Sequence, residues 1–192
     1  LARDLMLIEK TKVKAHFARL SSAKSIELVA DAKAAGMDVT ADVALHSLLL
    51  TDNVLSEFDG HYHVLPPLRS EDDRLTLIEG IKAGVISATE PGMANLEILL
   101  PLAMTLMDEG DLDFNVLLSC LTQGPASCIG IDAGSLAVGS YADVVLFDST
   151  ARWNWSGSNR KTKGQNSPWI GENLIGKVVS TYLSGQKVFP IN

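Results

Sequence analysis

Two segments of the sequence decide the fold, AHFARLSS at residues 15–22 and VTADVALHSL at residues 39–48. Each is an apolar, strand-like run that ends in polar residues and leads into helical or loop sequence. In α/β barrels the catalytic groups sit at the carboxyl ends of the strands. A third segment, YHVLPPLR at residues 62–69, completes the stretch in which a barrel enzyme would hold its chemistry. We therefore expect the site of this chain, active or emptied, between Lys14 and Arg69.

Helix-like and strand-like runs alternate around these segments at short intervals. Leu1–Lys10 has the period of an amphipathic helix, and Val13–Phe17 has the weak alternation of a strand. Ser21 or Ser22 can cap the next helix, which is expected to end at Gly36 before the second segment begins its strand. This order favours parallel strands joined by right-handed crossovers.

The middle of the chain is less regular. Residues 45–69 form a long irregular segment broken by Pro66-Pro67, and a loop of this length in a compact domain is uncommon unless it is functional. Ser70 opens a helix that begins with a capping box. The further elements expected here are the rest of that helix to Gly84, a short strand at 85–87, a helix at 93–107 with a kink or break at Pro101, and helices at 113–120 and 125–129.

The sequence pattern changes beyond Asp132. Glycines punctuate short β-prone runs at 144–147, 177–183 and 187–189, as expected of a small antiparallel sheet with tight turns. We therefore place a boundary near residue 131.

Composition narrows the classes of function. The formal net charge of −7 over 192 residues argues against a nucleic-acid partner, because such a surface needs clustered Lys and Arg. The longest apolar run, Leu96–Met107, is interrupted and too short to span a bilayer, so no membrane partner is expected. Cys120 and Cys128 lack CxxC spacing and a nearby His. They read as buried thiols of a reducing compartment, which predicts a cytoplasmic location.

Four stretches carry a family resemblance. Gly134–Asp148 resembles the segment with which cyclic amidohydrolases enter the β-sandwich beside their barrel. Together with Val39–Thr51, Pro66–Arg69 and Lys163–Pro168, it is similar to bacterial dihydroorotases of the type associated with aspartate transcarbamoylase, and most like the inactive homologue in such complexes. The resemblance covers the whole chain but only the C-terminal half of such an enzyme. It implies an α/β fold: the C-terminal half of a TIM-type (β/α)8 barrel at residues 1–130, then a small β-sandwich segment at 131–192.

The resemblance also implies a chemistry that these residues do not match. Dihydroorotases interconvert carbamoyl aspartate and dihydroorotate on two zinc ions held by an HxH pair, a carboxylated Lys, two later His residues and an Asp. Arg19 stands where the first later His belongs, and a guanidinium has no lone pair for zinc. His46 is the only retained ligand position, flanked by Leu45 and Ser47 instead of Pro and His. Leu65 replaces the Asn that binds the substrate ring.

The Asp-His-x-Pro-His segment that ends the family's last strand is absent between Ala88 and Thr89. Either it was deleted, or the sequence omits a loop at this point. An omitted stretch is favoured, because a last strand of four residues would barely close a barrel. The same reasoning predicts that the N-terminal half of the barrel exists elsewhere, in another segment or in a part of the chain outside this sequence.

Several residues have a structural interpretation beside the functional one. His46 can be a hydrogen-bonded histidine at the barrel mouth, and His16 is expected in the core. The His61-Tyr62-His63 sequence imitates a metal pair but lies in a loop. Arg69 could bind a carboxylate bidentately or pair with Glu71 or Asp73. Two tryptophans, Trp153 and Trp155, are expected to pack the small sheet.

These observations predict a vestigial substrate pocket formed by Arg19, His46, Leu65 and Arg69, with no catalytic residue, metal or cofactor. The favoured function is a non-catalytic subunit, homo- or hetero-oligomeric, that holds aspartate transcarbamoylase catalytic chains in a larger assembly. One alternative is an active zinc-dependent cyclic amidohydrolase acting on a ring amide such as a hydantoin. Another is a binding module that senses a pyrimidine intermediate.

Overall fold

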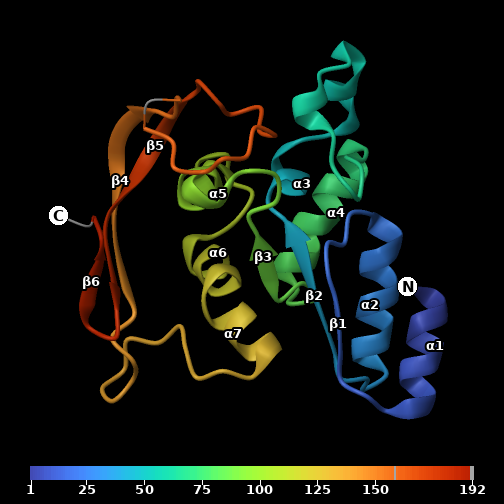
Figure 1. Cartoon of the computed structure of the whole chain (residues 1–192). Coiled ribbons are helices and arrows are strands. Elements are labelled where there is room, and N and C mark those ends of the chain that lie inside the picture. Colours follow the sequence, from blue (N-terminus) through green and yellow to red (C-terminus); the bar gives the residue numbers. More distant parts are fainter. Residues whose placement is uncertain (158, 191–192) are drawn as a thin grey trace.

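A computed structural model describes residues 1–157 and 159–190, with two sheets on either side of a layer of helices (Figure 1). The first sheet is parallel and has the strand order β1-β2-β3. The second is antiparallel and has the order β4-β5-β6. The strands are β1 (Ala15–Phe17), β2 (Val39–Ala44), β3 (Ala88–Glu90), β4 (Val144–Asn154), β5 (Asn173–Leu183) and β6 (Gln186–Phe189).

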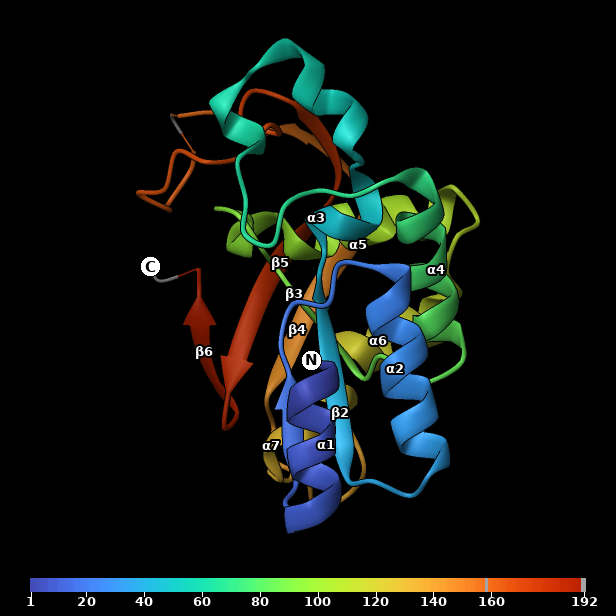
Figure 2. The ribbon, with the colours of Figure 1, turned by 90° about the vertical axis from the view of Figure 1, so that its right-hand side faces the viewer.

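The central strand β2 has one apolar and one polar face. Val39, Ala41 and Val43 are fully buried beneath α2 (Ala23–Ala34) and α4 (Glu71–Lys82), which cover that side of the sheet (Figure 2). Thr40 and Asp42 point to the other face and are half-buried. Because side chains alternate along β2, its apolar residues contact the helices on one face and its polar residues lie on the other face. The helix α1 (Ala2–Thr11) flanks α2 in both views.

Side-chain caps fix where two of the covering helices begin. Ser22 accepts a hydrogen bond from the backbone N–H of Ser25 at the start of α2, and Ser70 accepts one from that of Asp73 in α4. Asp73 in turn accepts the backbone N–H of Ala23 at 2.7 Å, and this bond is the main reason that the pKa of Asp73 is lowered. The predicted caps are confirmed, and one of them also ties α4 to α2.

The third strand lies later than the sequence predicts. Strand structure was expected at residues 85–87, but the backbone N–H groups of Val85 and Ile86 both donate to the carbonyl of Gly80 and close the end of α4. The strand is Ala88–Glu90 instead, with Ala88 opposite Asp42 of β2. Ala88 and Thr89 are consecutive within this strand, and the omitted loop between them stays a prediction.

The helices of the middle layer are η3 (Leu96–Ile98), α5 (Leu99–Asp108), α6 (Phe114–Leu121) and α7 (Gln123–Ile129). The helix expected at residues 93–107 therefore begins later, and Pro101 lies in the first turn of α5, where proline needs no kink. Helix α5 packs on β5, whereas α6 and α7 pack on β3. No helix among the described residues is long and apolar enough to cross a bilayer.

The antiparallel sheet packs on this layer through its tryptophans. Trp155, just after β4, is fully buried, and Trp153 donates its Nε1–H to the carbonyl of Gly176 at 2.8 Å. The expected packing role of both residues is confirmed. Residues 131–143 join α7 to β4 without helix or strand, and the boundary predicted near residue 131 falls at their start. The described part of this region is one three-stranded sheet, so a sandwich stays a prediction.

The side chain of Arg74 in α4 links three parts of the helical layer by hydrogen bonds. Its guanidinium donates to Glu71 at 2.7 and 2.8 Å, to Asp111 at 2.8 Å and to the carbonyl of Leu48 at 3.0 Å. Only 15% of the side chain is exposed. We expect Arg74→Gln to lower the free energy of unfolding by about 2 kcal/mol in urea denaturation, because Asp111 loses its partner in a poorly solvated site.

The matched control for this prediction is Lys82→Gln. Lys82 forms an exposed ion pair with Glu79 on the same helix, and such pairs contribute about 0.5 kcal/mol or less. Equal losses in the two variants would contradict the role given to Arg74.

Candidate functional site

The candidate site lies where the three parallel strands end. Arg19 follows β1, His46 follows β2, and Glu90 is the last residue of β3. Because the carboxyl ends of parallel strands share one edge, these three residues come together although 71 positions separate the first from the last. A cavity of about 350 Å³ opens here and is lined by Arg19, His46, His63, Val64, Leu65, Gly92, Met93 and Asn166.

Arg19 is held in a left-handed backbone conformation, with φ of +59°. Its backbone N–H donates to Oδ1 of Asp42 at 2.6 Å, while Oδ2 of Asp42 lies 2.8 Å from Nε2 of His16. Nε of Arg19 lies 2.7 Å from Oε1 of Glu90, an ion pair whose angle falls outside hydrogen-bond geometry. Asp42 therefore stabilises the left-handed backbone of Arg19, and this conformation places the Arg19 guanidinium at the strand ends.

The structure corrects the expectation that His16 is a core residue. Its side chain lies on the polar face of the parallel sheet, is one-third exposed and contacts Thr40 and Asp42, each at 2.8 Å. Alternation along β1 puts Ala15 and Phe17 on the opposite face, so the histidine cannot share their packing.

His46 begins α3 (His46–Leu49) and is only 4% exposed. Neither ring nitrogen has a hydrogen-bond partner among the described residues. A Cβ at Gly92 would overlap Nδ1 of this ring, so glycine is required there both for space and for its φ of +57°. Burial, with a smaller contribution from the Arg19 cation, lowers the pKa of His46 to about 4. The ring is therefore neutral at neutral pH. Because neither nitrogen has a partner among the described residues, the interpretation of His46 as a hydrogen-bonded histidine is not supported there.

Of the four predicted pocket residues, Arg69 alone lies outside the cavity lining. It is exposed, and no described carboxylate forms an ion pair with it. Glu71 pairs with Arg74 instead, and the charge of Arg69 makes only a minor contribution to lowering the pKa of Asp73. Leu65 lines the cavity but is 74% exposed, so it forms part of the rim.

The irregular segment over the cavity contains η1 (Asp52–Glu57) and η2 (Gly60–Tyr62). In η2, His61 contacts Oδ1 of Asp59 at 2.7 Å, whereas His63 follows the helix and lines the cavity. The two histidines of the HxH-like sequence therefore have different surroundings. The sequence was expected in a loop; the structure places His61 and Tyr62 in η2 and His63 just after it.

A distant loop contributes Asn166, which the site prediction did not include. Asn166 donates from Nδ2 to the carbonyl of His63 at 2.9 Å, and its own carbonyl accepts the backbone N–H of Ala94 at 2.9 Å. The next residue, Ser167, donates to the buried Oδ1 of Asn95 at 2.7 Å. These bonds dock the loop before β5 onto the strand ends. The only signal in the sequence was the family-like stretch 163–168.

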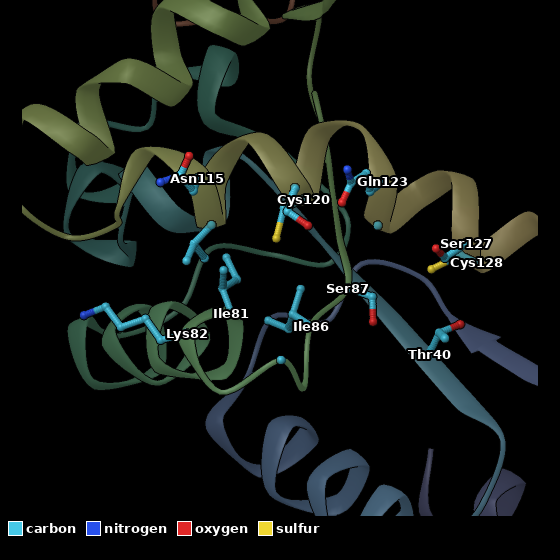
Figure 3. Close-up of a pocket in the computed structure, with 14 residues that line it drawn as sticks. Thr40, Ile81, Lys82, Ile86, Ser87, Asn115, Cys120, Gln123, Ser127 and Cys128 are labelled. Atoms are coloured by element: carbon cyan, nitrogen blue, oxygen red, sulfur yellow. The ribbon is translucent and has the colours of Figure 1, made fainter. Parts of the chain in front are cut away.

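A second cavity, of about 600 Å³, lies between α4, α6 and α7, near the beginning of β2 (Figure 3). Its lining includes Cys120, Cys128 and Lys82. Cys120 is buried, which raises the pKa of its thiol, and Cys128 is half-buried; both are free thiols. A protonated thiol is a poor nucleophile. Because this cavity is at the opposite end of the strand from His46, we place the candidate site at the smaller one.

The residues present do not fit a zinc centre. Within residues 1–157 and 159–190, no group of three or more His, Cys, Asp or Glu side chains is placed to hold a metal ion. The guanidinium of Arg19, paired with Glu90, is close enough to His46 for its positive charge to contribute to lowering the pKa of that ring.

Comparison with known proteins places this chain in a family. Residues 2–188 match the family described as "Amidohydrolase family". The chain belongs to the amidohydrolase family. A "Dihydroorotase-like protein" of Pseudomonas aeruginosa is 47% identical over 204 aligned positions, which cover 96% of this chain and 48% of that protein. A "Dihydroorotase" of Syntrophotalea carbinolica is 32% identical and is covered to 49%. This amidohydrolase chain thus spans about half the length of the curated relatives it matches.

Solved amidohydrolase structures share the fold. An L-hydantoinase from Arthrobacter aurescens matches 97% of this chain with a TM-score of 0.87 at 24% identity, and 47% of the hydantoinase is covered. The inactive dihydroorotase-like domain of a Chaetomium thermophilum multifunctional protein matches with a TM-score of 0.72 at 21% identity, over 97% of this chain and 54% of that one. The predicted α/β class is confirmed, whereas the half-barrel and sandwich assignments stay predictions.

Proposed function

We propose that this chain is part of a dihydroorotase-like protein that does not hydrolyse ring amides. The Arg19–Glu90 ion pair carries the proposal, because it supplies a fixed cation and its counter-charge beside His46, the one ligand position retained. A metal-dependent hydrolase needs several neutral or anionic donors around an ion that activates water. The cavity lining offers two imidazoles, His46 and His63, and among the described residues no group of three donors is placed to hold an ion.

We further propose that this protein is a structural subunit that holds aspartate transcarbamoylase catalytic chains. The partner follows from the sequence resemblance to dihydroorotases of that type. Support comes from apolar side chains on the loop above the site, with Phe58 94% exposed and Leu65 74% exposed. Exposed aromatic and aliphatic groups of this kind are typical of protein contact surfaces. Light scattering of the mixed proteins should show a larger particle than either alone.

A cyclic amidohydrolase with altered metal ligation is the second candidate. The hydantoinase-like fold and the retained His46 favour it. It would need donors in place of Arg19, and the cavity offers only His63 as a further imidazole. A hydantoin substrate therefore belongs in the same assay.

Zinc content and turnover test the proposed function. We expect the full-length protein, purified with zinc supplied, to bind less than one zinc per chain and to show no turnover of dihydroorotate, carbamoyl aspartate or hydantoin above buffer. The dihydroorotase of S. carbinolica serves as the active control. Two zinc ions per chain together with turnover of any of these substrates would refute the proposal.

A further inference from the structure

We propose that the cavity at the strand ends is a binding site for a small organic carboxylate, with Arg19 and His46 as its polar contacts. The inference rests on the proposed function, since it takes the cavity to be free of metal. It differs from metal chemistry because the ligand is an anion that meets a cation of the protein. Three features of the cavity support the inference. They are the terminal nitrogens of Arg19, the buried ring of His46, and the negative charge of Glu90 beside Arg19.

The fork of Arg19 has capacity left for a ligand. Its Nε faces Glu90, and among the described residues none accepts a hydrogen bond from Nη1 or Nη2. The side chain is 53% exposed and lines the cavity, so a ligand can reach the terminal nitrogens. Two parallel N–H groups match the two oxygens of a carboxylate.

His46 supplies a second polar contact from the buried side. The residue is 96% shielded, lines the cavity and has no hydrogen-bond partner for either ring nitrogen within the described structure. An unpaired buried polar group is unfavourable, and a ligand that accepts its N–H removes that cost. Because the ring is neutral, it can donate one hydrogen bond without adding charge.

Charge and size favour a monocarboxylate over phosphate. Glu90 already brings one negative charge to Arg19, so a dianion would leave an excess of two negative charges at the site, whereas a monocarboxylate leaves one. A cavity of about 350 Å³ holds a small organic molecule, and Val64, Leu65 and Met93 offer apolar contacts for its body.

Calorimetry of the full-length protein with butyrate tests the inference. We expect saturable binding in the millimolar range, no binding of butyramide, and weaker binding of inorganic phosphate. The ring signals of His46 should shift with butyrate in NMR spectra, at the same concentrations. Binding of butyramide as strong as that of butyrate, or tighter binding of phosphate, would overturn the assignment.

Three variants locate the site. Arg19→Gln should weaken butyrate at least about tenfold. Glu90→Gln should strengthen it several-fold, because the fork loses its internal competitor. Arg3→Gln, the matched control on exposed α1, should change nothing. Unchanged affinity in both Arg19→Gln and Glu90→Gln would overturn the inference. Zinc measured on the same samples separates the cases: zinc with turnover refutes the proposed function, whereas zinc-free protein that ignores butyrate refutes only this inference.

Discussion

Trp155→Ala is expected to lower the free energy of unfolding by about 4 kcal/mol, the largest single loss that we predict. The indole is 0% exposed and joins the core shared by the antiparallel sheet and the helices. Its backbone N–H and C=O also bond to Glu172 and Gly171, which lie between the docked loop and β5. Urea denaturation followed by circular dichroism should show the loss as a lower midpoint.

The control at this position is Trp155→Phe. The indole Nε1–H has no partner among the described residues, so phenylalanine removes an unpaired donor while keeping most of the buried ring. We expect a loss of about 1 kcal/mol. A larger loss for phenylalanine than for alanine would show that the ring does not act through packing.

The stability of the protein should depend on pH through His46. Its pKa is about 4 when folded and near 6.5 when unfolded, so between these values only the unfolded chain binds the proton. The part of the unfolding free energy that depends on a neutral His46 is therefore fully present above about pH 6.5, and it is lost as the pH falls toward 4. From the pKa difference, the loss near pH 4.5 is about 2.5 kcal/mol.

The variant His46→Gln isolates this effect, since glutamine does not titrate. The difference in unfolding free energy between wild type and variant should shrink or reverse by about 2.5 kcal/mol from near pH 7.5 to near pH 4.5. Parallel pH profiles for the two proteins would mean that His46 is solvated or hydrogen-bonded when folded.

Local sequence signals predicted much of the fold. Ser22 and Ser70 cap their helices as predicted, because a cap depends only on residues within one turn. The third strand was misplaced because Val85 and Ile86 look like strand residues locally, while their N–H groups are taken by Gly80. The pairing of Ala88 with β2 is a long-range contact, so the residues next to Ala88 in the sequence do not reveal it.

The residues of the site that follow the predicted strands could be found from the sequence, whereas their tertiary partners could not. Arg19 and His46 end adjacent parallel strands, and strand ends converge in any such sheet. The partner of Arg19 was missed, because Glu90 lies outside the strand that was predicted at residues 85–87. Asn166 was missed as part of the site because its loop reaches the cavity only after the antiparallel sheet has packed on α5.

The contact between Arg19 and Glu90 also bears on how reversible such a site is in evolution. A substitution of Arg19 by histidine would leave the Glu90 carboxylate without its present counter-ion, while the backbone N–H of residue 19 could still donate to Asp42. We therefore expect histidine at residue 19 to be tolerated best together with an uncharged residue at position 90.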